Sequence, residues 1–191
     1  MSRRKGRVSK AFPFLIAILL ACGGIAGYIV GTRMKVKEEV PISVARLYFS
    51  DPQAEFLIPE ERKMGLDIEA EKRGFGPGTC KAIQAVIEEL IKGPSSPSLA
   101  ATIPKGTTLR NAFVSDHIAY LDFSKELKTK HCGGSSGELM TVYSIVNTIL
   151  DNFRYIKGVK ILIEGMDVET LAGHLDISKA LTKNDFIVKG P

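Results

Sequence analysis

Residues 135–163 read SSGELMTVYSIVNTILDNFRYIKGVKILI, and this stretch decides the fold class. From Leu139 to Phe153 the apolar residues recur every three or four positions, which is the spacing of one buried helix face. Ser135 and Glu138 have the spacing of a capping box, so we expect the two residues to cap this helix reciprocally. The apolar run at 159–163 predicts a strand directly after the helix. A helix that leads into a strand indicates a fold that mixes both elements.

Further elements are predicted on the N-terminal side of this stretch and just after it. A second amphipathic helix starts with Thr79 as its N-cap and ends before Gly93-Pro94. Three hairpins are expected, formed by strands 44–49 with 55–59, 109–114 with 118–123, and 159–163 with 168–171. A weaker strand signal, without an assigned partner, lies at 66–70. We therefore predict an α+β domain in which two amphipathic helices pack on one face of a mixed or antiparallel sheet.

An uncharged apolar stretch, FPFLIAILLACGGIAGYIVG at 12–31, precedes this domain. A helix of about 20 residues spans a hydrocarbon core about 30 Å thick. The tail at 1–11 is basic and carries no acid, and such a flank stays in the cytoplasm. We predict a single-pass transmembrane signal anchor in a bacterial inner membrane, with the domain outside the cytoplasm.

Two alternatives to the signal anchor stay open. A cleaved secretory signal has an apolar region of about 7–15 residues, which is shorter than the run seen here. A lipoprotein acylated at Cys22 would explain the sequence LLACG at 19–23. In either alternative the domain is still exported.

The distribution of charge argues against a nucleic-acid partner. The chain has a formal net charge of +5, but from Val40 onward it carries 18 basic and 19 acidic residues. The excess of positive charge therefore precedes the domain, and no nucleic-acid binding is expected. We expect a juxtamembrane linker at 32–41, one domain at 42–178 and a C-terminal tail at 179–191.

Cysteine and histidine only weakly indicate a bridge or a metal site. An extracytoplasmic setting permits a disulfide between Cys80 and Cys132, but the sequence does not show that they are close enough. His131 beside Cys132, with His117 or His174 as a third ligand, lacks the paired spacing typical of zinc sites. We expect no metal and no cofactor.

Five phrases of the exported region, in order, resemble a known family. They are RLYFSD at 46–51, IPKGT at 103–107, AYLDFS at 119–124, GSSGE at 134–138 with VYSIVNT at 142–148, and VETLAGHLD at 168–176. Together they resemble the GerMN domain, the sporulation and spore-germination domain. The resemblance implies a non-enzymatic module outside the membrane that assembles with envelope proteins or with its own copies, and some relatives are akin to ring-building domains.

A serine hydrolase is the least favoured hypothesis. Gly133–Gly137 satisfies G-x-S-x-G, and Asp167 and His174 follow in hydrolase order. The nucleophile elbow needs an apolar strand directly before the serine, and KTKHC at 128–132 is no such strand. The capping box already explains Ser135, so no catalytic residue is assigned.

The glycine-rich approach to the helix that starts at 135 is the remaining candidate site. Free amides and the helix dipole attract anions there, whereas Glu138 competes for the same amides. The candidate ligand or partner contacts are Lys128, Lys130, Gly134, Ser135, Ser136 and Gly137. Binding of an amino acid or a peptidoglycan fragment is kept as the alternative function, although a small molecule is not expected as the main partner.

Overall fold

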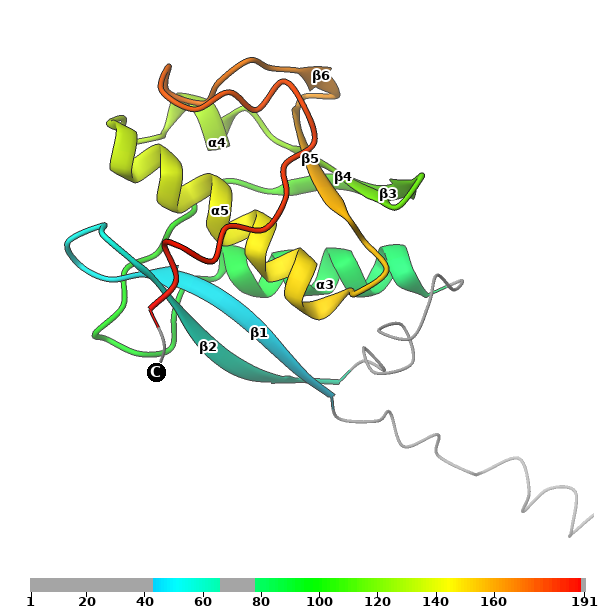
Figure 1. Cartoon of the computed structure of the whole chain (residues 1–191), viewed down its shortest axis with the longest axis horizontal. Helices are drawn as coiled ribbons and strands as arrows, with labels where there is room; N and C mark the ends of the chain where they lie inside the picture. The colour runs from blue at the N-terminus through cyan, green and yellow to red at the C-terminus, as the bar shows by residue number, and fades with distance from the viewer. Residues whose placement is uncertain (1–42, 66–77, 190–191) are drawn as a thin grey trace, which may run out of the picture. The chain divides into compact units, whose positions relative to one another are not determined.

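The computed structural model describes residues 43–65 and 78–189 (Figure 1). The predicted basic tail, membrane-spanning segment and linker lie outside the described residues, and so does the weak strand signal at 66–70. Within the described part of the chain, no helix has the length and apolar character needed to cross a membrane.

The first hairpin forms a small sheet of its own. β1 (Ser43–Ser50) and β2 (Leu57–Met64) pair antiparallel along their whole length. The turn between them is fixed by Asp51, whose Oδ1 accepts the amides of Glu55 at 2.8 Å and Phe56 at 3.2 Å. This hairpin was predicted, although its second strand runs to Met64 instead of ending at residue 59.

The other four strands form a mixed sheet in the order β3-β4-β5-β6. They are β3 (Leu109–Ser115), β4 (Ile118–Phe123), β5 (Gly158–Ile163) and β6 (Met166–Asp167). β4 and β5 run parallel, and the other two pairs are antiparallel. The predicted mixed character is confirmed, but the prediction of one sheet is wrong because the first hairpin remains separate.

Two-residue turns set the register of both hairpins in this sheet. Asp116 and His117 have φ of 50° and 64°, and Glu164 and Gly165 have φ of 54° and 78°, as type I′ turns require. The second turn closes at Gly165, so its return strand is β6, at 166–167. The strand predicted at 168–171 is therefore wrong, and those residues form a loop.

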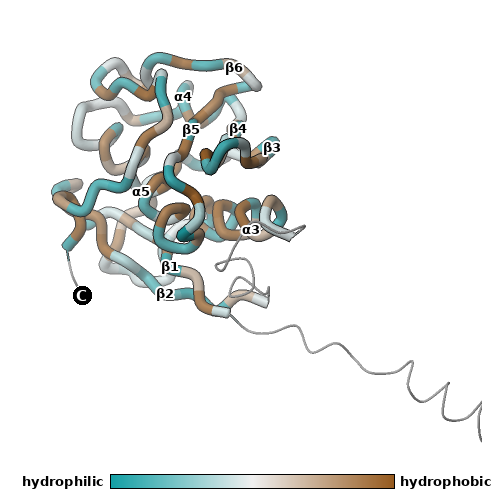
Figure 2. The backbone as a smooth tube through the Cα atoms, turned by 45° about the vertical axis from the view of Figure 1, so that its right-hand side comes forward, coloured by the Kyte–Doolittle hydropathy of each residue, from teal (hydrophilic) through white to brown (hydrophobic). Residues whose placement is uncertain are grey.

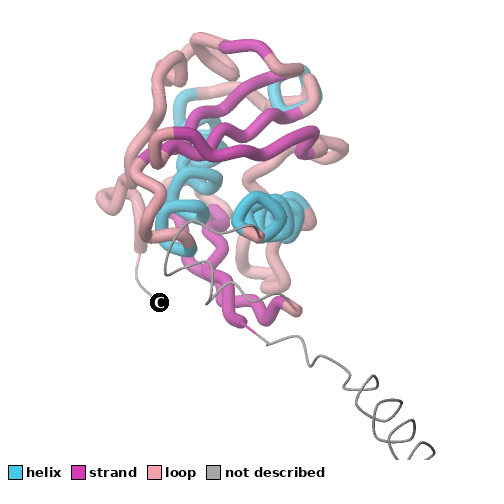
Figure 3. Tube along the Cα trace, turned by 90° about the vertical axis from the view of Figure 1, so that its right-hand side faces the viewer, coloured by secondary structure: helices cyan, strands magenta, loops and turns pink. Residues whose placement is uncertain are grey.

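Helices α3 (Thr79–Ile91) and α5 (Ser135–Asn152) lie between the two sheets, as Figure 3 shows. α3 packs on β3 and β1, and α5 packs on β1 and β5. A short helix that the sequence did not predict, α4 (Glu126–Thr129), precedes α5. The N-cap of α3 is Gly78, and the predicted cap Thr79 is instead the first helical residue and is buried.

One apolar core joins both sheets through the helices. Figure 2 shows hydrophobic residues along α3 and α5. The largest buried side chains in it include Phe49 of β1, Phe123 of β4 and Phe153 at the C-cap of α5, all of them 0 % exposed. Burying one such side chain contributes about 1.5–3 kcal/mol, so this core supplies most of the driving force for folding.

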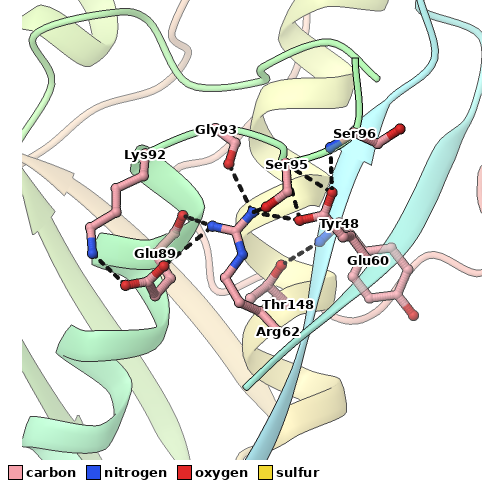
Figure 4. A network of polar contacts seen from close by, with 9 residues as sticks. All are labelled: Tyr48, Glu60, Arg62, Glu89, Lys92, Gly93, Ser95, Ser96 and Thr148. Carbon is pink, nitrogen blue, oxygen red and sulfur yellow. Dashed lines mark hydrogen bonds and ion pairs between the residues drawn. The ribbon is translucent and has the colours of Figure 1, made fainter. Parts of the chain in front are cut away.

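The outer edge of β1 is hydrogen-bonded to side chains of α5 instead of to a neighbouring strand. The Oδ1 atom of Asn152 accepts a hydrogen bond from the Arg46 amide at 3.0 Å. The Nδ2 atom of Asn152 donates a hydrogen bond to the Arg46 carbonyl at 2.7 Å. Thr148 Oγ1 accepts the Tyr48 amide at 3.1 Å (Figure 4). These bonds satisfy backbone groups that a strand edge otherwise leaves unpaired, and they fix the hairpin on the helix.

The C-terminal segment, which the sequence assigned to a tail after the domain, is hydrogen-bonded into the domain. Its contacts, in chain order, are Leu181 with Val159 of β5, Asn184 with Asn147 of α5, and Ile187 and Lys189 with Leu57 of β2. Most of these bonds involve backbone atoms, which leave no apolar pattern in the sequence. The segment thus crosses from one sheet to the other and belongs to the domain.

Candidate functional site

The start of α5 is not closed by the predicted capping box. Its N-cap is Gly134, with φ of 80°, and no side chain forms a cap hydrogen bond. Ser135 and Ser136 are exposed in the first turn. The capping-box prediction is wrong because the Glu138 side chain has turned away toward a different set of amides.

Glu138 is a buried carboxylate that holds the loop after β6. Its side chain accepts the amides of Leu171 at 2.8 Å, Ala172 at 2.9 Å and His174 at 2.8 Å. Burial alone would raise the pKa of this carboxyl, but the backbone amides outweigh burial and hold the pKa below its ordinary value. This carboxylate is 0 % exposed, and its three amide bonds join the first turn of α5 to that loop.

His131 is fixed through both ring nitrogens. Nδ1 accepts the Gly133 amide at 3.0 Å, and Nε2 lies 3.0 Å from Oγ1 of Thr141. The Thr141 hydroxyl donates its own proton to the Thr102 carbonyl at 2.6 Å, so Nε2 must carry the proton in the other bond. His131 therefore has no nitrogen left to bind a metal or to deprotonate the adjacent Cys132.

Cys132 lies against the first turn of α5. A Cβ atom at Gly137 would come within 3.3 Å of its Sγ, which explains why the helix has a glycine at that position. Cys132 is exposed and Cys80 is half-buried, and both are free thiols in the structure. The bridge that the sequence left open is not formed.

Two small hollows adjoin at this end of the molecule, between the loop at 100–104 and α5. Their volumes are about 110 Å³ and 130 Å³. Both are lined by Ala101, Thr102, Cys132 and Thr141. The smaller hollow is also lined by Ile103, Pro104, Lys130 and His131, and the larger one includes Asp51 and Gly137.

The structure brings only part of the predicted contact set together. Lys130 lines the smaller hollow, and Gly137 lines the larger one. Lys128 is exposed on α4 and lines neither hollow. The other three residues of the predicted set also line neither hollow; they are Gly134, Ser135 and Ser136. Thr102 was not predicted from the sequence, because an unpaired buried hydroxyl leaves no sequence signal.

The residues of the hydrolase pattern do not form a triad. Asp167 of β6 pairs with Lys160 of β5 at 2.9 Å. His174 lies in the loop that donates amides to Glu138, and Ser135 follows a turn instead of a strand. Among the described residues, neither Asp167 nor His174 forms a hydrogen bond with Ser135.

The third histidine, His117, contacts neither of the two small hollows beside α5. His117 Nδ1 lies 3.0 Å from the Tyr155 carbonyl, beside a separate hollow of about 320 Å³. Over the described ranges of the chain, no three His, Cys, Asp or Glu side chains gather closely enough to hold a metal ion.

Comparison with known proteins identifies the fold. The family model described as sporulation and spore germination, Germane, matches residues 46–169, from β1 to the end of the last hairpin. The chain belongs to this family. The resemblance to the GerMN domain that the sequence suggested is thereby confirmed.

Solved structures agree with a GerMN fold. The first GerMN domain of the sporulation protein GerM from Bacillus subtilis has a TM-score of 0.56 at 23% identity, with 75% of this chain and 99% of that chain covered. The tandem GerMN domains of the same protein have a TM-score of 0.53 at 22% identity, with 74% of this chain and 46% of that chain covered. This chain therefore spans about half the length of the tandem. A Clostridium perfringens protein described as a lipoprotein has a TM-score of 0.50 at 29% identity, with 75% of this chain and 89% of that chain covered. No curated protein matches the chain.

Proposed function

We propose that this chain holds a non-enzymatic GerMN domain at the outer side of a bacterial cytoplasmic membrane, where it assembles with other envelope proteins or with its own copies. Family membership supports a role in complexes of the sporulation or germination type. The apolar stretch at 12–31 supports a transmembrane anchor. The likeness to a protein described as a lipoprotein supports acylation at Cys22 as the other means of attachment.

One observation carries the non-enzymatic part of this proposal: the polar groups suited to chemistry are used by the fold. Glu138 binds backbone amides, and both ring nitrogens of His131 are occupied. Ser135 has no histidine or carboxylate partner among the described residues. Nucleophilic catalysis needs a nucleophile within hydrogen-bond reach of a base, and this site offers no such pair.

Attachment to a membrane makes weak contacts sufficient for assembly. Confinement to one plane raises the effective concentration of neighbouring copies without adding any new contact. A domain of this kind can therefore act through surfaces of modest affinity. This is consistent with a Glu138 and a His131 whose hydrogen-bonding groups are used by the fold.

A fluorophosphonate probe, which reacts with activated serines, tests the absence of chemistry. We expect the folded full chain to show no labelling at Ser135, because no base is present to activate its hydroxyl. Peptide mass spectrometry of the probe-treated chain, with Ser135→Ala as the matched control, is the measurement. Labelling that disappears in Ser135→Ala while circular dichroism shows an intact fold would replace the interaction proposal with a hydrolase.

A further inference from the structure

The smaller hollow beside α5 has an unusual combination of lining groups. Lys130 lines it, whereas no aspartate or glutamate does. Ala101, Ile103 and Pro104 add an apolar wall. A cation beside small apolar side chains matches a ligand group that has one negative charge and a short aliphatic substituent.

Thr102 supplies an independent observation at the same hollow. The residue is 7 % exposed, and its Oγ1 has no hydrogen-bond partner among the described residues. Its neighbour Thr141 differs, because the Thr141 hydroxyl donates to the Thr102 carbonyl. A buried hydroxyl without a partner is unfavourable, so its presence calls for a partner that a bound group would supply.

Lys130 is positioned for such a role, and its charge also acts on the nearby Glu126 carboxylate of α4 without forming an ion pair with it. Its ammonium forms no ion pair with any carboxylate of the described residues. A Cβ at Gly106 would lie 2.9 Å from Nζ, and Gly106 has φ of 91°. The glycine therefore lets the ammonium lie close to the turn that follows Pro104, at the rim of the hollow.

We propose that this hollow binds the terminal carboxylate of a peptide that ends in a small aliphatic residue such as alanine. The Lys130 ammonium and the Thr102 hydroxyl would donate to the carboxylate, and the wall formed by Ala101, Ile103 and Pro104 would contact the methyl group. A volume of about 110 Å³ is well below that of pockets for drug-sized ligands, so only the last residue of a peptide fits.

The neighbouring hollow does not offer the same chemistry. Asp51 lines it, and the negative charge of that carboxylate opposes a bound anion. Glu138, which the sequence placed in competition for an anion, is turned toward the loop at 171–174. The binding group is therefore assigned to the smaller hollow alone, and the assignment does not depend on the assembly role proposed above.

Binding of N-acetyl-Ala-Ala to the full chain in detergent tests this inference. We expect a saturable rise in melting temperature, because a ligand that binds only the native state stabilises it. The same dipeptide with its carboxylate converted to an amide is expected to produce no shift. No saturable shift with the free acid, or equal shifts with acid and amide, would overturn the proposal.

Two variants separate ligand recognition from stability. Thr102→Val keeps the shape of the side chain, so we expect an unchanged or higher melting temperature without ligand, together with at least a fivefold loss of affinity. Lys130→Met is expected to weaken binding tenfold or more, whereas Lys128→Met, at an exposed lysine outside the hollow, is expected to bind like the parent chain. Retained affinity in both Thr102→Val and Lys130→Met would refute the site. Cross-linking of the chain in membranes reports on assembly and is unaffected by that outcome.

Discussion

Glu138→Ala is expected to lower the free energy of unfolding by about 3–5 kcal/mol, because it removes a buried carboxylate and leaves one buried and two partly buried amides without their acceptor. The loop at 171–174 is then no longer attached to α5. Urea unfolding of the full chain in detergent, followed by circular dichroism, measures the change. Added formate is expected to restore part of the loss, because its carboxylate can occupy the space left by the side chain.

The matched control for this prediction is Glu88→Ala. Glu88 is exposed on α3, so its removal is expected to change the free energy of unfolding by less than about 0.5 kcal/mol. If Glu138→Ala were no less stable than Glu88→Ala, the buried carboxylate would not be holding the loop.

The same carboxylate gives stability a defined pH dependence. Its pKa in the folded chain is lower than the value of about 4.3 expected for an unfolded glutamate. Its contribution is therefore present above the unfolded pKa and is lost as the pH falls through the lower folded pKa. Between pH 7 and pH 3 the parent chain is expected to lose more stability than Glu138→Gln, which has no charge to titrate at this position.

Arg62→Met is expected to destabilise the domain by about 2–4 kcal/mol, because the guanidinium joins β2 to the loop after α3. The group is 17% exposed and donates to the Glu89 carbonyl at 3.1 Å, the Gly93 carbonyl at 3.0 Å and Ser95 Oγ at 3.0 Å (Figure 4). It also pairs with the carboxylates of Glu60 and Glu89. Methionine keeps the apolar stem and removes every donor, so thermal unfolding of this variant measures the loss of those bonds.

Lys92→Met is the control for the arginine substitution. Lys92 pairs with the same Glu89 but is 65% exposed, and exposed pairs contribute about 0–1 kcal/mol. Equal melting temperatures for the two variants would show that the hydrogen bonds of Arg62 to the loop add nothing to stability.

The elements that depend on apolar periodicity could be predicted from the sequence. The buried face of α5 and the hairpin at 109–123 were both visible as repeating patterns, and the structure contains both. The arrangement of the sheets could not be predicted in the same way. Asn152 and Thr148 take the place of a strand beside β1, and one side-chain amide in a helix carries no signal for that role.

The candidate site was predicted less completely, for a physical reason. Ser135 and Glu138 have the spacing of a capping box, but the same glutamate can also accept amides from a loop more than 30 residues further along the chain. Only the fold decides between these partners. The unpaired hydroxyl of Thr102 likewise becomes visible only when its surroundings are known.

The most direct test of the proposed function is cross-linking of the full chain on intact cells with a membrane-impermeant, amine-reactive reagent. Exposed lysines such as Lys92 and Lys128 make the described domain reactive. We expect intermolecular cross-links from these lysines to envelope proteins or to further copies of the chain, identified by mass spectrometry. Reaction only after cell lysis, or reaction on intact cells that yields intramolecular cross-links alone, would contradict a domain that is displayed outside the membrane and acts by assembly.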